Sequence, residues 1–250
     1  MDEKVVVVIQ ARMGSTRLPG KVMLPLAGDH VLTHDIRRAS AAETVDEVVV
    51  ATSTKKADDI VARYGDRAGA TVSRGSETNV LDRMFEGATA ADADVVVRIT
   101  ADCPLLDPET VDTVVRCLVD ADADYASNTL DRTFPRGLDV EAFTYAGFER
   151  VHERATTSAQ LEHVTPYYHQ HDDQFDLVNV SSSDVFGEPW LQNRTSLRLT
   201  LDEADDYELL RTIYENLPFD GVLPIREAIR YVDEAGLDEL NADVEQKSVG

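Results

Sequence analysis

Short apolar strands alternate with helix-like segments through the first half of the chain, and this alternation constrains the fold more than any other feature. The expected strands are Val5–Ile9, Glu47–Ala51, Ala70–Ser73 and Asp94–Ile99, and the segments with helical spacing are Val31–Ala42, Asp58–Tyr64, Asn79–Ala91 and Glu109–Val119. Near-continuous apolar strands joined by helical crossovers are typical of a mostly parallel sheet with helices on both faces. Such sheets bind ligands at the carboxyl ends of their strands, so we expect a functional site in the loops that follow these runs.

The second half of the chain resumes the alternation after an interruption. Strands are expected at Asp124–Ser127, Phe175–Val180 and Leu197–Leu201, and closing helices at Asp205–Asn216 and Ile225–Glu234. Residues 129–196 break the pattern with the run Val140–Phe143 and a Tyr- and His-rich stretch, Glu162–His171, and we interpret them as a small inserted lobe. No repeat or linker divides the 250 residues, so we expect a single domain over residues 1–250.

The chain is strongly acidic, with 24 Lys and Arg residues against 47 Asp and Glu residues and a net charge of −23. This balance argues against a protein that binds the nucleic-acid backbone, which requires a basic face. Acidic residues spread along the whole chain favour a halophilic source. No window approaches the ~18 uninterrupted apolar residues of a membrane span. The N-terminus runs directly into a strand without a secretory signal, so we expect a cytoplasmic protein with no membrane contact.

A cationic loop with two glycines, Ala11-Arg-Met-Gly-Ser-Thr-Arg-Leu-Pro-Gly-Lys21, follows the first strand. Glycine lets backbone N–H groups approach an anion closely, and Arg12, Arg17 and Lys21 would neutralise it, so the loop is a candidate phosphate cradle. It is not a Walker loop, because Val22 stands where Ser or Thr would follow the lysine, and its glycine spacing does not fit a dinucleotide fingerprint. The alternative is a surface loop whose cations are simply solvated.

Two aspartates come directly after strand-like runs, Asp102 beyond Asp94–Ile99 and Asp202 at the end of Leu197–Leu201. Both are expected at the same edge of the sheet as the cationic loop. Such a pair can hold Mg²⁺, which takes oxygen ligands and usually only one or two protein carboxylates. The structural alternatives are a turn cap for Asp102 and a helix N-cap for Asp202, with first-turn acids favoured by the helix dipole. We expect Asp202 to be both cap and ligand.

These stretches resemble the cytidylyltransferases that activate acidic sugars, namely the acylneuraminate and 3-deoxy-manno-octulosonate cytidylyltransferases, and most of all the spore-coat polysaccharide biosynthesis protein subfamily. The resemblance runs from about residue 4 to about residue 215. The matching stretches are, in order, Ile9–Lys21, Val48-Val-Val-Ala-Thr-Ser53, Arg74-Gly-Ser-Glu77 through Val80-Leu-Asp-Arg83, Asp102-Cys-Pro-Leu105, Gly137-Leu-Asp-Val-Glu141, Glu162-His-Val-Thr-Pro166 and Asp202–Asp206. The first is highly specific, because several unusual residue types recur in a fixed register.

The resemblance implies a nucleotide-diphospho-sugar transferase fold, which is a Rossmann-like three-layer α/β/α sandwich with a small lobe that commonly makes the dimer contact. It therefore implies a homodimer, with CTP as donor and Mg²⁺ as cofactor. The implied catalytic residues are Arg12, Lys21, Asp102 and Asp202, of which Asp102 and Asp202 would be the metal ligands. The implied nucleotide-binding residues are Ala11, Arg12, Met13, Gly14, Ser15, Arg17, Lys21, Thr52, Ser53 and Arg74.

The sugar side of the site is matched less closely. The polar candidates for the substrate pocket are Asn128, Arg132, Arg136, Asp139, Glu141 and His163. Arg132 or Arg136 could pair a sugar carboxylate through two parallel hydrogen bonds, and the alternative for each is an exposed loop charge. His163 is more typical of a structural or dimer-interface histidine than of a general base.

The leading hypothesis is a Mg²⁺-dependent cytidylyltransferase that transfers CMP from CTP to a sugar acid of the nonulosonic type for surface polysaccharide biosynthesis, releasing pyrophosphate. One alternative is a glycosyltransferase of the same fold. It would need an Asp-x-Asp metal site, but Asp120-Ala-Asp122-Ala-Asp124 lies where solvent suits it better than a diphosphate. A nucleotidyltransferase that uses UTP or GTP is a nearer alternative. A non-catalytic nucleotide-binding subunit is the third, and it conflicts with the retention of both the cations and the acids.

Overall fold

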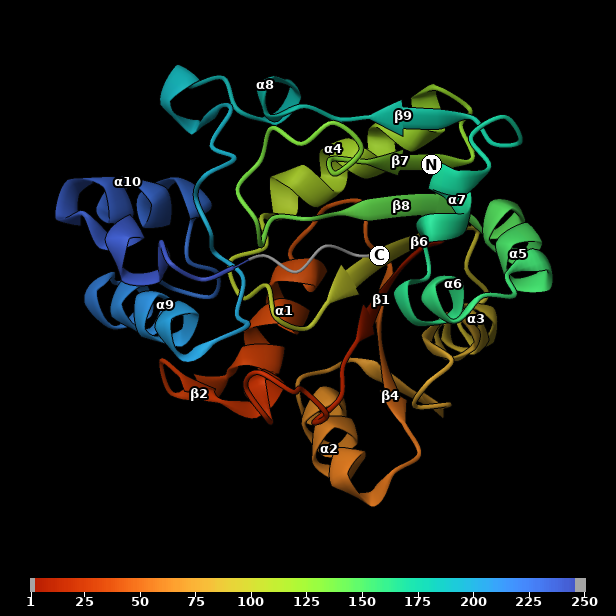
Figure 1. The fold of residues 1–250 in the computed structure, drawn as a ribbon, viewed down its shortest axis with the longest axis horizontal. Helices are drawn as coiled ribbons and strands as arrows, with labels where there is room; N and C mark the ends of the chain where they lie inside the picture. The colour runs from red at the N-terminus through yellow and green to blue at the C-terminus, as the bar shows by residue number, and fades with distance from the viewer. Residues whose placement is uncertain (1–2, 246–250) are drawn as a thin grey trace.

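A single seven-stranded sheet organises the computed structural model, which describes residues 3–245 (Figure 1). The strand order is β5-β4-β1-β6-β8-β7-β9. The strands are β1 (Val5–Gln10), β4 (Glu47–Ser53), β5 (Thr71–Gly75), β6 (Val95–Thr100), β7 (Tyr125–Ser127), β8 (Glu141–Thr144) and β9 (Leu177–Asn179), and a separate hairpin pairs β2 (Pro25–Leu26) with β3 (Asp29–His30). The mostly parallel α/β architecture predicted from the sequence is confirmed.

The four strands expected in the first half form the parallel part of the sheet. β1 lies between β4 and β6 and is parallel to both, and β4 is parallel to β5. Successive β1 side chains enter opposite cores: Val5, Val7 and Ile9 join one apolar cluster, and Val6 and Val8 join the other. This burial on both faces explains why the strand is an unbroken apolar run rather than an alternating one.

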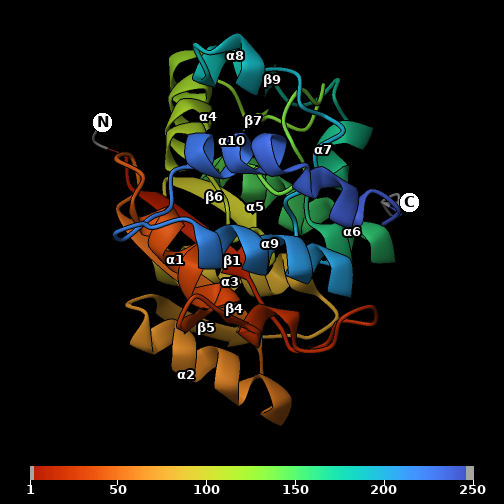
Figure 2. The same cartoon turned by 90° about the vertical axis from the view of Figure 1, so that its left-hand side faces the viewer.

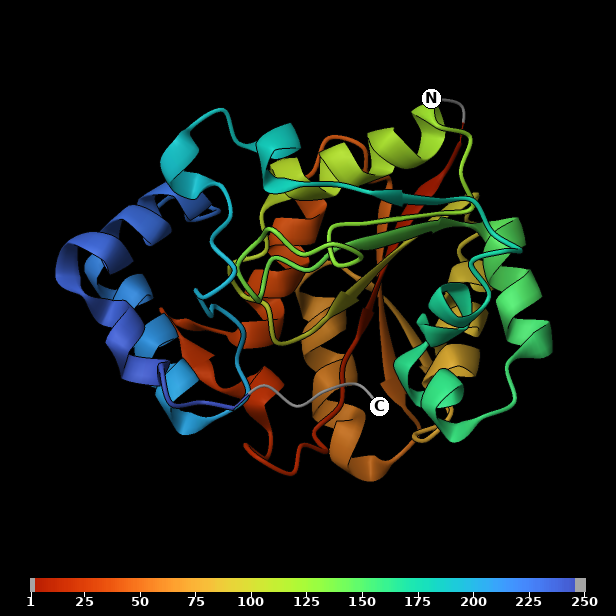
Figure 3. The ribbon, with the colours of Figure 1, turned by 45° about the horizontal axis from the view of Figure 1, so that its top comes forward.

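Helices cover the two faces of the sheet and make the fold a three-layer sandwich (Figure 2). One face packs against α1 (Val31–Ser40), α2 (Asp59–Arg67), α4 (Pro108–Asp120), α8 (Ser182–Val185), α9 (Ala204–Asn216) and α10 (Ile225–Ala235). The other face packs against α3 (Val80–Ala90), α5 (Tyr145–Arg154), α6 (Ser158–His163) and α7 (Pro166–Gln170). Short 3₁₀ helices are η1 (Lys21–Met23), η2 (Lys56–Asp58), η3 (Pro189–Leu191) and η4 (Leu237–Asn241). The closing helices α9 and α10 lie together beside the sheet (Figure 3).

Residues 129–196, interpreted above as an inserted lobe, contribute two strands to the central sheet. β8 is antiparallel to both β6 and β7, and β9 extends the sheet beside β7. α5 packs against α3 on the outer face. A role of this segment in dimer contact stays a prediction.

The prediction of a strand at Leu197–Leu201 is wrong. The segment makes one isolated bridge, between Arg198 and Arg136, and no ladder with a strand of the sheet. Its backbone instead bonds to two loops: the Arg136 N–H donates to the carbonyl of Leu197 at 3.0 Å, and the Leu201 N–H donates to the carbonyl of Asp102 at 2.8 Å. The alternating Leu side chains are buried as in a strand, but their partners are loops.

None of the helices within residues 3–245 is both long enough and apolar enough to cross a bilayer.

Candidate active site

Two cavities open where the carboxyl ends of β1 and β6 diverge into loops. The first, of 410 Å³, is lined by the loop that follows β1, by the residues that follow β6, and by parts of α3 and α6. The second, of 460 Å³, lies over the antiparallel part of the sheet. Thr100 and His163 line both cavities, so the two spaces adjoin at these side chains. This is the sheet edge at which open α/β folds bind ligands.

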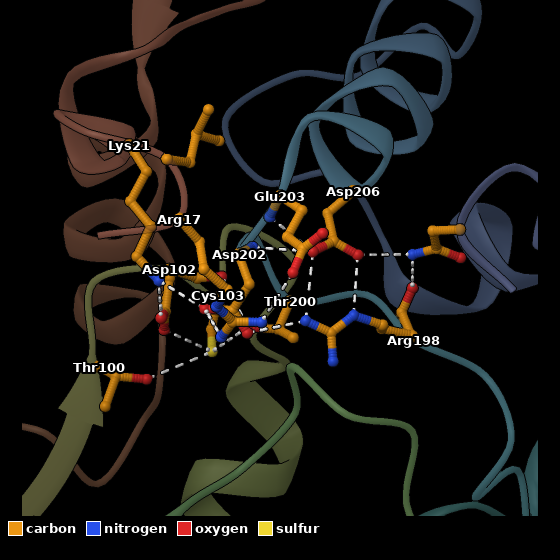
Figure 4. Close-up of polar contacts among 12 residues, drawn as sticks. Arg17, Lys21, Thr100, Asp102, Cys103, Arg198, Thr200, Asp202, Glu203 and Asp206 are labelled. Carbon is orange, nitrogen blue, oxygen red and sulfur yellow. Dashed lines mark hydrogen bonds and ion pairs between the residues drawn. The ribbon is translucent and has the colours of Figure 1, made fainter. Parts of the chain in front are cut away.

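Asp102 and Asp202 meet in the first cavity on one ammonium group (Figure 4). Lys21 Nζ donates to Oδ2 of Asp102 at 2.6 Å and to Oδ1 of Asp202 at 2.8 Å. An NH2 group of Arg17 lies 2.8 Å from the same Asp202 oxygen. The two aspartates and two of the loop cations therefore form one cluster, although 100 residues of chain separate the acids.

The close opposite charges in this cluster keep Lys21 and Asp202 ionised. Burial alone would lower the pKa of Lys21, but Asp102 and Asp202 outweigh it and raise that pKa. Burial alone would raise the pKa of Asp202, but the cations, Lys21 foremost and then Arg198 and Arg17, lower it to about 2. Both groups are charged at neutral pH, and Asp202 is ready to bind a cation.

Arg198 fixes the position of Asp202 from behind the cavity (Figure 4). It donates to Oδ2 of Asp202 at 2.7 Å and, through Nε, to the fully buried Asp206 at 2.8 Å. Asn241 donates to that same Asp206 oxygen at 2.8 Å, so η4 closes the network. Burial and several hydrogen-bond donors hold the Asp206 side chain in place. Because Arg198 bonds to both Asp206 and Asp202, the Asp202 side chain is held in place as well.

Asp202 is not the helix N-cap, contrary to the sequence prediction. Glu203 is the N-cap of α9, and Asp206 completes the capping box with it. The Asp206 carboxylate accepts the N–H groups of both Asp202 and Glu203, at 2.8 and 3.0 Å. The side chain of Asp202 is thus released from capping and points to Lys21.

The loop after β1 is braced by η2 and by its own turn. The Met13 N–H donates to Oδ1 of Asp58 at 2.7 Å, and the Gly20 N–H donates to the Met13 carbonyl at 3.0 Å. Gly20 has φ of +72°, a conformation that glycine adopts without strain. Arg12 donates to the Glu77 carbonyl at 3.2 Å and lies 3.6 Å from the Glu162 carboxylate. Of the predicted nucleotide-binding residues in this loop, Ala11, Arg12, Gly14, Ser15, Arg17 and Lys21 line the first cavity.

The remaining predicted nucleotide-binding residues lie behind that lining. Ser53 donates to the Asp58 carboxylate that also holds the loop, and Thr52 is fully buried. Arg74 donates to the Ser53 carbonyl at 2.9 Å and pairs with Asp59. Their position, like that of Met13, suits support of the loop, and their contact with a nucleotide stays a prediction.

Arg83 lines the first cavity and was missed at the sequence level. It is only 1% exposed, it donates to the Ser76 carbonyl at 2.6 Å, and its Nε has no hydrogen-bond partner within the described residues. No carboxylate of residues 3–245 lies within 4 Å of its guanidinium. Burial, and then repulsion from Arg12, lower its pKa to about 10. A buried cation without an acid is costly, and an anion in the cavity would relieve the cost. The sequence does carry an indication of this role, because Arg83 is a charged residue on the otherwise apolar, buried face of α3.

The second cavity is lined by three arginines, two of which already have acidic partners. Arg132 pairs with Asp139 through two hydrogen bonds, of 2.5 and 2.8 Å. Arg98, which the sequence analysis did not name, pairs with the buried Glu141. Burial alone would raise the pKa of Glu141, but Arg98 and the other hydrogen-bond donors outweigh it and lower that pKa.

Arg136 is the third arginine of the second cavity, and no carboxylate of the described residues lies within 4 Å of it. Burial, and then repulsion from Arg132, lower its pKa. Gly137, next to it, has φ of +102°, and a Cβ there would lie 2.5 Å from the Leu199 backbone, so only glycine fits. Asn128 is fully buried and bonds to the Leu138 carbonyl and the Val140 N–H, so it supports the cavity wall from outside the lining.

Comparison with known proteins assigns the chain to a family. Residues 6–221 match the cytidylyltransferase family, and the chain belongs to it. It is 34% identical over 215 residues to the spore coat polysaccharide biosynthesis protein SpsF of Bacillus subtilis, with 83% of this chain and 85% of that protein covered. It is 28% identical over 236 residues to the 3-deoxy-manno-octulosonate cytidylyltransferase of Solibacter usitatus, with coverage of 88% and 91%.

A solved structure is similar over the whole chain. It is a cytidylyltransferase from Leptospira borgpetersenii, with a TM-score of 0.87 and 27% identity, and the match covers 98% of this chain and 100% of the other. The chain is therefore a nucleotidyltransferase of the cytidylyltransferase family, as its sequence motifs indicated.

Proposed function

We propose that the protein transfers CMP from CTP to a hydroxyl group of a nonulosonic-type sugar acid, with Mg²⁺ as cofactor and pyrophosphate as the other product, for the synthesis of a surface polysaccharide. The observation that carries the proposal is the junction of two cavities of different chemistry. The first joins a cationic loop to a pair of aspartates, and the second presents an arginine without an acid.

The donor set of the first cavity fits Mg²⁺. Asp102 and Asp202 already converge on one cation, the ammonium of Lys21, so their oxygens can share another. Two carboxylates are what protein sites usually offer this ion, and no cluster of three or more His, Cys, Asp or Glu residues competes within residues 3–245. When bound, the ion would neutralise phosphoryl charge and make the incoming hydroxyl more acidic.

The side chains of the chain itself bind and orient the donor. Negative charge develops on the phosphoryl oxygens as the hydroxyl attacks the α-phosphorus and the bond to pyrophosphate breaks, so fixed cations must face those oxygens. Arg83 supplies cationic charge without a carboxylate within 4 Å among the described residues, and Arg12 has only the Glu162 carboxylate, at 3.6 Å. Lys21 can exchange its aspartate partners for a phosphate. Arg198 keeps Asp202 aimed at the same point throughout.

The second cavity suits an acidic acceptor. Of the two arginines proposed from the sequence, Arg132 is already paired with Asp139. Arg136 has no such partner within the described residues, so we assign to it the carboxylate of the acceptor. A planar guanidinium and a carboxylate match through two parallel hydrogen bonds.

The alternatives are less well supported. The Asp-x-Asp run of a glycosyltransferase falls at the end of α4 and outside both cavities, and Asp124 is occupied by Arg150 at 3.0 Å. The geometry does not separate CTP from UTP or GTP, and our choice of CTP is supported by the family. A non-catalytic subunit would not need the Lys21 cluster.

The test is direct. Pure protein is incubated with Mg²⁺, each of CTP, UTP and GTP, and a panel of sugar acids with their neutral analogues, and pyrophosphate release is measured. We expect release only with CTP and an acid. Release with a neutral sugar, or none with any acid, would overturn the proposal. The proposal includes a homodimer in which residues 129–196 make the contact, and light scattering after size-exclusion chromatography tests it.

A further inference from the structure

The segment Glu162-His-Val-Thr-Pro166 contains a strained turn. Val164 has φ of +72° and ψ of −59°, and it is the only β-branched residue with positive φ among those described. The Thr165 N–H donates to the His163 carbonyl at 2.8 Å, which closes a three-residue γ-turn of the rare positive-φ kind. Such a conformation costs of order 1–3 kcal/mol and persists where the surroundings enforce it, most often at functional sites.

Two anchors hold the turn. The Val164 side chain is fully buried in the apolar cluster on the α3 face of the sheet. Thr165 is also buried, and Pro166 then begins α7, which packs against α6 (Figure 1). His163, the last residue of α6, is thereby fixed at the edge of the site instead of continuing the helix.

The turn delivers His163 to the junction of the two cavities. Of the described residues, only His163 and Thr100 line both of them. The imidazole is half-buried, and it makes no hydrogen bond or ion pair with residues 3–245. His34 and His152, by contrast, each have a polar partner. The free ring nitrogens of His163 are therefore available to a ligand.

The chemistry at this junction requires a proton acceptor. When the acceptor hydroxyl attacks phosphorus, its oxygen forms the new P–O bond, the bond to pyrophosphate breaks, and the hydroxyl proton must leave. The Thr100 hydroxyl cannot take that proton, and Asp102 is engaged with Lys21. We propose that His163 is a catalytic residue of the transfer reaction and accepts the proton on a ring nitrogen. This assignment rests on the proposed function, and it replaces the structural role expected from the sequence.

The first experiment compares His163→Gln and His163→Ala with the wild type in the pyrophosphate assay. Glutamine keeps polar contacts but cannot accept the proton. We expect kcat to fall about 10²- to 10⁴-fold in both variants, as for loss of a general base, with KM for CTP changed only a few-fold. Imidazole added to the buffer should restore part of the His163→Ala rate. His171→Gln is the matched control, since His171 follows α7 and lines neither cavity, and it should keep wild-type kcat. Wild-type kcat in His163→Gln would overturn the assignment.

A second experiment separates this assignment from the proposed function. The His163 ring signal is identified by NMR from its absence in His163→Gln, and CTP with Ca²⁺ and a sugar acid are added separately. Because His163 lines both cavities, each ligand should shift its signal. If the wild type releases no pyrophosphate but both shifts occur, the proposed reaction fails and the placement of His163 at the junction stands. If the wild type turns over and either ligand leaves the signal unmoved, the assignment of His163 fails alone.

Discussion

Asp35 carries a carboxyl group whose burial should make the stability of the protein depend on pH. It lies on α1 and is fully buried, and the Cys103 backbone N–H is the one hydrogen-bond donor that approaches its oxygens among the described residues, without the geometry of a good hydrogen bond. Burial first, and then the nearby Asp102, raise its pKa well above 3.8, and the cationic Arg38 offsets this only in part. The folded protein therefore keeps Asp35 protonated at pH values where the unfolded chain ionises it.

The sign of the effect follows from that difference. A raised folded-state pKa gives stability that is complete below about pH 3.8 and is lost as the pH rises toward the folded pKa. Asp35→Asn replaces the acid by a neutral amide of the same shape and removes this dependence. The free energy of unfolding of the variant, minus that of the wild type, should increase by up to about 1.4 kcal/mol for each pH unit in this interval. Above the folded pKa the difference should become constant.

The assay is urea unfolding followed by circular dichroism between pH 4.5 and 8.5 at fixed ionic strength. The slope of the difference is the readout, because an imperfectly bonded amide adds a cost that does not change with pH. Asp112→Asn is the control: its buried carboxylate accepts N–H groups from Glu43 and Thr44, so its loss should destabilise by about 1–3 kcal/mol at neutral pH. A difference between Asp35→Asn and wild type that is the same at every pH would refute the reasoning.

Three further outcomes are expected. Lys21→Met removes the ammonium that competes with Mg²⁺ for Asp102 and Asp202. Without nucleotide, the variant should bind Mg²⁺ about tenfold more tightly than the wild type, a difference of about 1.4 kcal/mol, and it should lose turnover. Equal Mg²⁺ affinities of variant and wild type, measured by calorimetry, would contradict this. Arg83→Gln should weaken pyrophosphate binding about tenfold to a hundredfold by loss of charge-assisted hydrogen bonds. Arg116→Gln should not, because Arg116 of α4 pairs with Glu43 and lines neither cavity, and equal affinities of the two variants would exclude Arg83 from the anion site. Because a net charge of −23 repels itself, Tm should rise when KCl is increased from 0.2 to 2 M, and a Tm that is unchanged or lower would argue against adaptation to high salt.

The fold could be predicted where local pattern and tertiary environment agree. Val5–Ile9 is apolar at every position because both faces of its strand are buried, and Asp107 with Pro108 begins α4 by ordinary capping. Leu197–Leu201 was misassigned because its alternation is that of a strand, while its hydrogen-bond partners are the loops around Arg136 and Asp102. Sequence pattern reports which side chains are buried but not which backbone pairs with them.

The same limit applies to the site. The positions of Asp102 and Lys21 could be inferred because each follows a buried strand at one sheet edge. The role of Arg198 could not, because it depends on Asp206 and on Asn241, which is 43 residues further along the chain. The N-cap of α9 is Glu203 and not Asp202 as expected. Sequence pattern alone does not resolve a difference of one residue in where a helix begins. Contacts between distant segments decide such details.

The balance of charge in the two cavities links the sequence to the proposed substrates. In a chain with 47 acidic and 24 basic residues, an arginine in a cavity has many potential acidic partners. Arg12, Arg17, Arg98 and Arg132 have such partners. Arg83 in the first cavity and Arg136 in the second have none within 4 Å among residues 3–245, and the pKa of each is lowered by burial and by a neighbouring guanidinium. Each cavity therefore presents one arginine that could pair with an anion. A nucleoside triphosphate would supply it to the first cavity and the carboxylate of a sugar acid to the second, so a neutral sugar would leave Arg136 as it is in the unliganded protein.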